Sequence, residues 1–79
     1  MTWTVRLHTI PEDKLEALEE YCYEAVLKDP TFTFREEGAD GKIKYIIIGC
    51  VSKDQAFRRG SLFHHRFGCF YEVEWRKDK

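Results

Sequence analysis

Alternating apolar and polar residues predict four β-strands in this chain. Their expected ranges are 2–8, 31–36, 42–51 and 69–76. Successive side chains of a strand point to opposite faces, so an alternating stretch has one apolar and one polar face. The residues expected to face inward in the first, second and last strands are Trp3, Val5, Leu7, Phe32, Phe34, Tyr71, Val73 and Trp75.

A longer stretch with apolar residues at helical spacing follows the first strand. It begins near Thr9 and ends at Lys28 or Asp29, because Pro30 cannot continue a helix. Thr9 and Glu12 have the spacing of a capping box at its start. The expected core stripe of this helix is Leu15, Leu18, Cys22, Ala25 and Val26.

A second helix is expected to begin at the capping-box pattern of residues 52–55 and to end at Phe67, with Gly68 as its C-terminal cap. Gly60 leaves open a break into two shorter helices. Between the second and third strands, residues 38–41 end in Asp-Gly, which suits the positive φ angles of a tight hairpin turn.

The order strand, helix, strand, strand, helix, strand predicts a ferredoxin-like βαββαβ sandwich of the α+β class. Residues 1–79 are enough for a single domain. The sheet is expected to be antiparallel, with four strands in the spatial order 4-1-3-2. Right-handed connections then place both helices on one face.

The face turned away from the helices is expected to be mostly polar. Alternation in the third strand is taken to place Ile46 and Ile48 on this open face and Tyr45 and Ile47 on the other. The candidate residues of the open face are Arg6, His8, Ile46, Ile48, Glu72 and Glu74. Two interpretations stay open: long charged stems paired across strands cover the isoleucines, or the face binds a partner protein or a second copy.

Charge is unevenly distributed, although the formal net charge is only -1. Basic and aromatic residues are interleaved over residues 57–67, and on an unbroken helix the phenylalanines face mainly inward. The expected outward basic surface consists of Arg58, Arg59, Leu62, His65 and Arg66. Because guanidinium groups match carboxylates and phosphates, this surface is a candidate partner site. The alternative is pairing with acidic residues of the first helix.

The first helix has an acidic face. Glu16, Glu20 and Glu24 follow one another at four-residue spacing, and the one lysine in this series is Lys28 at the end of the helix. Tyr23 and Leu27 lie beside them and also point outward. One interpretation is an ordinary solvated face. The other is a surface for a basic partner, in which the carboxylates imitate nucleic-acid phosphates.

Several functional classes lack support in the sequence. No phosphate loop, nucleophile elbow or zinc-protease helix occurs, so neither an enzyme activity nor a cofactor is expected. Three cysteines without a Cys-x-x-Cys pair favour neither a disulfide framework nor a metal site. A pI of about 6.3 disfavours nucleic-acid binding as the main activity. No bilayer-spanning run or signal-peptide pattern is found, so no membrane partner and a cytoplasmic location are expected.

The layout is similar to that of the dimeric α+β barrel proteins. The similar features are a first strand, a helix ending at Asp29-Pro30, a hairpin, and residues 52–57 opening a helix with a histidine near its end. This resemblance implies a homodimer formed through the sheet and transfers no catalytic residue. It supplies one alternative function, a homodimeric ligand-binding protein or enzyme whose activity would depend on His8.

We expect a small non-enzymatic interaction module that acts by stoichiometric binding to another protein, such as a component of a nucleoprotein complex. Small domains of this style are common among inhibitors carried by phages and mobile elements, of which anti-CRISPR proteins that act on host nucleic-acid machinery are one example. A further alternative is direct nucleic-acid binding through Arg58, Arg59 and Arg66, which would weaken steeply with salt.

Overall fold

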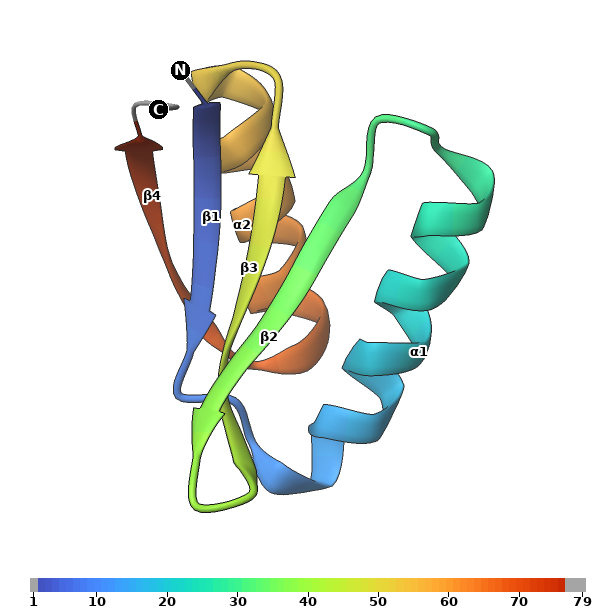
Figure 1. The fold of residues 1–79 in the computed structure, drawn as a ribbon, viewed down its shortest axis with the longest axis vertical. Helices are drawn as coiled ribbons and strands as arrows, with labels where there is room; N and C mark the ends of the chain where they lie inside the picture. Colours follow the sequence, from blue (N-terminus) through green and yellow to red (C-terminus); the bar gives the residue numbers. More distant parts are fainter. Residues whose placement is uncertain (1, 77–79) are drawn as a thin grey trace.

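The computed structural model describes residues 2–76 and confirms the predicted ferredoxin-like α+β fold (Figure 1). The elements in chain order are β1 (Thr2–His8), α1 (Glu12–Lys28), β2 (Thr33–Ala39), β3 (Lys42–Cys50), α2 (Lys53–Phe67) and β4 (Phe70–Arg76). The strands form one antiparallel sheet in the order β2-β3-β1-β4, which is the predicted arrangement. β2 and β4 are therefore its two edge strands.

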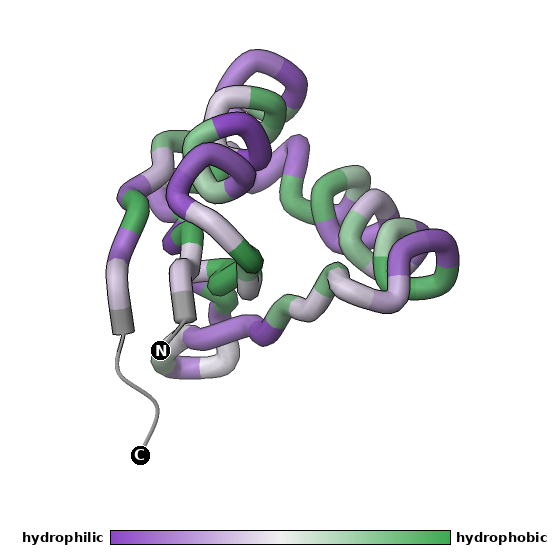
Figure 2. Tube along the Cα trace, turned by 90° about the horizontal axis from the view of Figure 1, so that it is seen from above, coloured by the Kyte–Doolittle hydropathy of each residue, from purple (hydrophilic) through white to green (hydrophobic). Residues whose placement is uncertain are grey.

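Both helices cover the same face of the sheet. α2 lies behind β1 and β3 in Figure 1, whereas α1 lies on the β2 side. Figure 2 shows the two helices from above, with apolar segments on each. The core between helices and sheet includes Val5, Leu7, Leu18, Cys22, Ile46, Ile48, Ala56, Phe63 and Phe67.

The prediction for the third strand was wrong by one residue. Val5 of β1 pairs with Ile48, and Leu7 pairs with Ile46, so the two isoleucines lie in the core and not on the open face. Ile47 is the isoleucine on the open face. Residues 45–48 of β3 are apolar on both faces of the strand, so their alternation does not show which residues face the helices. Only the register with β1 decides this.

The start of α2 and the hairpin turn follow the sequence prediction. The Ser52 hydroxyl accepts a hydrogen bond from the Gln55 amide (3.1 Å), and the Gln55 side chain accepts one from the Val51 amide (2.9 Å). Asp40 and Gly41 have φ angles of 57° and 74°, as a two-residue type I′ turn requires.

The predicted capping box of α1 does not form. The N-cap is Pro11, which has no side-chain oxygen to offer, and Thr9 lies before it with a φ of 52°. Thr9 Oγ1 instead shares a hydrogen bond of 3.0 Å with His8 Nδ1. The helix therefore begins two residues later than it would with Thr9 as its N-cap.

α2 is continuous through Gly60, so the possible break does not occur. A Cβ atom at this position would lie 2.2 Å from the ring of Tyr71 on β4. The glycine therefore permits close packing of the helix on the sheet, which accounts for its place in a helix interior.

Candidate interaction surface

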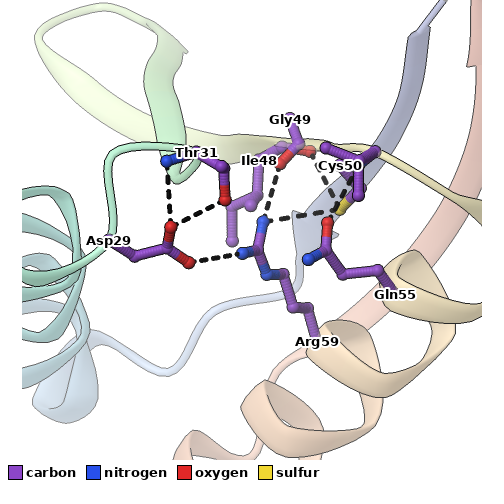
Figure 3. Close-up of polar contacts among 8 residues, drawn as sticks. Asp29, Thr31, Ile48, Gly49, Cys50, Gln55 and Arg59 are labelled. Carbon is purple, nitrogen blue, oxygen red and sulfur yellow. Dashed lines mark hydrogen bonds and ion pairs between the residues drawn. The ribbon is translucent and has the colours of Figure 1, made fainter.

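Arg59 is not part of an outward basic surface, and this prediction was wrong. Its side chain is only 14% exposed and lies between α2, β3 and the end of α1 (Figure 3). Nη1 donates to the carbonyl oxygen of Gly49 (2.9 Å), and Nη2 contacts Asp29 Oδ2 (3.2 Å). The guanidinium also lies over the Phe32 ring, 4.9 Å from its centroid. Arg59 is thus a structural tie between three elements.

Asp29, the C-cap residue of α1, is held from two sides. Its Oδ1 atom accepts hydrogen bonds from the Thr31 hydroxyl (2.7 Å) and the Thr31 amide (2.9 Å), while Oδ2 faces Arg59 (Figure 3). The Thr31 hydrogen bonds, followed by the Arg59 charge, lower the pKa of Asp29. The predicted pairing between the basic and acidic regions therefore exists, but at the end of α1 and not along its acidic face.

The other members of the expected basic surface stay on the outer side of α2. Arg58, Leu62, His65 and Arg66 are exposed. The guanidinium of Arg66 lies 4.9 Å from the centroid of the Tyr21 ring, which belongs to α1. What remains is a smaller basic region than the composition of residues 57–67 suggests.

The open sheet face is closed by its own charged side chains. Arg6 contacts Glu72 (2.6 Å) and Glu74 (3.2 Å), and its guanidinium lies 5.3 Å from the centroid of the Tyr45 ring. The hydrogen bond with Arg6 lowers the pKa of Glu72. Ile47 beneath this layer is only 4% exposed. The arrangement agrees with the interpretation that charged stems cover the apolar strand.

His8 also lies on this face, at the end of β1. Its Nε2 atom is 3.9 Å from Glu72 Oε1, and its ring is stacked on Phe70 with a centroid distance of 6.2 Å. These contacts account for the position of the histidine without a bound ligand.

The acidic face of α1, defined as Glu16, Glu20 and Glu24, is exposed along its length. Within residues 2–76, none of the three carboxylates has an ion-pair partner. Arg66 shares a groove with Glu20 and Glu24 but remains beyond ion-pair distance of both. The acidic face is thus exposed and without ion pairs in the described range, with Lys14 and Arg66 at the edge of the same groove.

An apolar stripe runs beside the acidic face, and we define it as Tyr23, Val26 and Leu27. Leu27 is 86% exposed and Tyr23 is 57% exposed. Their spacing of three and four residues puts the three side chains on one side of the helix. Tyr23 packs edge-on against Phe34 of β2, with ring centroids 5.2 Å apart. The stripe therefore connects the surface of α1 to the sheet.

Between this stripe and β2 lies a shallow open groove of about 650 Å³, which we call the edge groove. One side is the apolar stripe of α1, and the other is the continuous segment from Phe32 to Glu36. Its lining is mainly apolar, with Arg35 and Glu36 at one end, and protein interfaces likewise have an apolar centre and a polar rim.

The edge groove adjoins a pair of carboxyl groups at the contact between α1 and β2. Partial burial, followed by repulsion from Glu19 and a hydrogen bond with Glu19, raises the pKa of Glu36. The same two carboxylates contribute, after burial, to raising the pKa of the core thiol of Cys22 to about 12. Cys22 itself is fully buried in the core, as structural cysteines are.

Sequence reasoning missed two parts of this surface. Val26 was assigned to the core stripe, but it is exposed, and Phe34 was seen only as an inward strand residue. The signal for the first was present, because Tyr23, Val26 and Leu27 form a second stripe beside the core stripe. The contact with Phe34 depends on how α1 lies against β2, which no local pattern encodes.

Two kinds of feature are absent from the described part of the chain. Within residues 2–76, no three histidine, cysteine, aspartate or glutamate side chains gather as ligands for a metal ion. None of the helices in the same range is long and apolar enough to cross a membrane.

Comparison with known proteins adds no assignment. No family model matches this chain, and no curated protein or solved structure matches it either.

Proposed function

We propose that this chain is a non-enzymatic module that binds another protein stoichiometrically through the outer face of α1 and the adjoining edge of β2. The observation that supports this proposal is the exposed apolar stripe, above all Leu27 at 86% exposure. A single exposed leucine is ordinary. Three apolar side chains beside a groove form a contiguous patch of the type that marks interaction sites.

The partner in this proposal presents a basic surface. Residues 12–28 contain six acidic and two basic side chains, and within residues 2–76 no carboxylate of the acidic face forms an ion pair. Complementary charge speeds association and disfavours acidic partners. A basic protein surface that otherwise contacts nucleic acid fits this requirement, so we propose the role of an inhibitor of nucleic-acid machinery in the style of anti-CRISPR proteins.

The other candidate surfaces have less to support them. Direct nucleic-acid binding relied on three arginines, and Arg59 is committed to Gly49 and Asp29. Dimerisation through the open sheet face relied on exposed isoleucines, whereas Ile47 is covered and the other two are in the core.

The test is capture of a partner from cells of the native host with the tagged protein and two matched variants. Leu27→Lys places a positive charge in the apolar stripe. Val51→Lys makes the same chemical change at another highly exposed position, in the loop before α2, where the side chain is 72% exposed. We expect a specific protein to be captured by the parent and by Val51→Lys but not by Leu27→Lys, with unchanged circular dichroism in all three.

Equal capture by all three proteins would remove the α1 face from the proposal. A third variant with Arg58→Glu and Arg66→Glu locates any alternative site, because both side chains are exposed on α2. Loss of the partner in that variant, with retention in Leu27→Lys, would transfer the binding site to the basic surface.

A further inference from the structure

The edge groove exposes the backbone edge of β2. It is lined by the consecutive strand residues Thr33, Phe34, Arg35 and Glu36. Neighbouring residues of a strand point to opposite faces, so a groove that contacts all of them runs past the edge of the strand and not over one face. The sheet order β2-β3-β1-β4 places β2 at that edge.

An edge strand of this kind offers a row of backbone donors and acceptors to an added strand. β2 is seven residues long and contains no proline, which would have removed a donor. The apolar stripe of α1 forms the opposite wall, so an added strand gains side-chain contacts as well as backbone hydrogen bonds. Strand addition with pockets for alternate side chains is a recurring mode of peptide recognition.

Charge argues against a second copy of this chain in the groove. Pairing of β2 with its own copy would bring two α1 helices together, each with six acidic and two basic residues. Glu36 already lies against Glu19 within one chain, and burial, followed by repulsion from Glu19, raises the pKa of Glu36. A symmetric dimer would add further like charges to this region, at a cost in free energy.

We propose that an extended, basic segment of the partner protein adds to β2 as a fifth strand; this rests on the proposed function. Every second side chain of that segment points to the α1 side. There, apolar side chains contact the stripe around Leu27, and lysine or arginine side chains approach Glu36 and its neighbour Glu19. The remaining side chains meet the open-face ion pair between Arg35 and Glu37, whose atoms are 3.3 Å apart.

The test uses a capped synthetic octapeptide with the sequence Thr-Lys-Thr-Val-Thr-Lys-Thr-Val and a control in which glutamate replaces lysine. Titration of the isotope-labelled protein is followed by amide NMR, together with hydrogen exchange. We expect shifts confined to β2 and the second half of α1, and slower exchange of β2 amides that point outward. Leu27→Lys weakens the affinity at least about tenfold, whereas Val51→Lys leaves it unchanged.

Three results would overturn the inference: equal affinity for the lysine and glutamate peptides, shifts centred on another surface, or binding that is insensitive to Leu27→Lys. A parent protein that sediments as a dimer, and as a monomer after Leu27→Lys, would assign the groove to a second copy instead. The host partner separates this inference from the proposed function. Suppose that Leu27→Lys abolishes capture of the host partner, but that the partner, when bound to the parent protein, does not slow the exchange of β2 amides. The proposed function then stands, and the proposal of strand addition fails.

Discussion

At the scale of single residues, Arg58 and Arg59 show how neighbouring arginines acquire different roles. Arg58 is exposed on α2, whereas Arg59 donates to the Gly49 carbonyl. We predict that Arg59→Ala lowers the free energy of unfolding by about 1–3 kcal/mol, because the Gly49 carbonyl loses a charge-assisted hydrogen bond. Arg58→Ala is the matched control and changes it by less than about 0.5 kcal/mol. Urea unfolding followed by circular dichroism measures both, and equal effects would contradict the structural role of Arg59.

Glu36 provides a prediction about pH. Its pKa is raised in the folded protein, so on raising the pH the unfolded chain releases this proton first, near pH 4.3, and the folded chain follows at higher pH. Stability contributed by this group is therefore present at low pH and lost as the pH rises through that window. We expect Glu36→Gln to be more stable than the parent at pH 7, with a difference that shrinks toward pH 4. The urea midpoints of both proteins at pH 4 and pH 7 check this. A parent protein that is more stable than Glu36→Gln at pH 7 would contradict it.

At the scale of secondary-structure elements, the two helices differ in how firmly they are packed. Two of the 17 residues of α1 are buried, compared with four of the 15 in α2. Low burial lowers the free energy of local opening. We predict that the backbone amides of α1 exchange with deuterium before those of α2, as measured by mass spectrometry on the native protein. Protection of α1 equal to that of α2 would show that its contacts are stronger than its burial indicates.

Element types and their order could be predicted from local patterns. The helix start at Ser52, the Asp-Gly turn and the stop before Pro30 each depend on residues close together in the chain, and all three are present. The phase of β3 and the inward turn of Arg59 depend on partners far away in the chain. Local periodicity carries no information about those partners, and both predictions failed for that reason.

The candidate surface was only partly predictable, because part of it also depends on residues that are far apart in the chain. The acidic face of α1 and the outward positions of Tyr23 and Leu27 follow from helical spacing and are present. The edge groove exists because α1 lies along β2 at the edge of the sheet. A single sequence predicts α1 and β2 as elements, but it does not predict how α1 packs against β2.

At the scale of the whole molecule, the charged regions differ in whether their side chains are paired within the fold. The open sheet face is internally paired through Arg6, and part of the basic segment is used to tie three elements together. Within residues 2–76 the acidic face of α1 forms no ion pair, and Leu27 of the apolar stripe is 86% exposed. The central claim is therefore that this face, and not the basic one, binds the partner.

Calorimetric titration of the purified host partner with the parent, Leu27→Lys and Val51→Lys proteins tests that claim most directly. We predict one-to-one binding by the parent and by Val51→Lys, and an affinity at least about tenfold weaker for Leu27→Lys. Equal affinity of all three proteins, measured with their folds intact, would contradict the account.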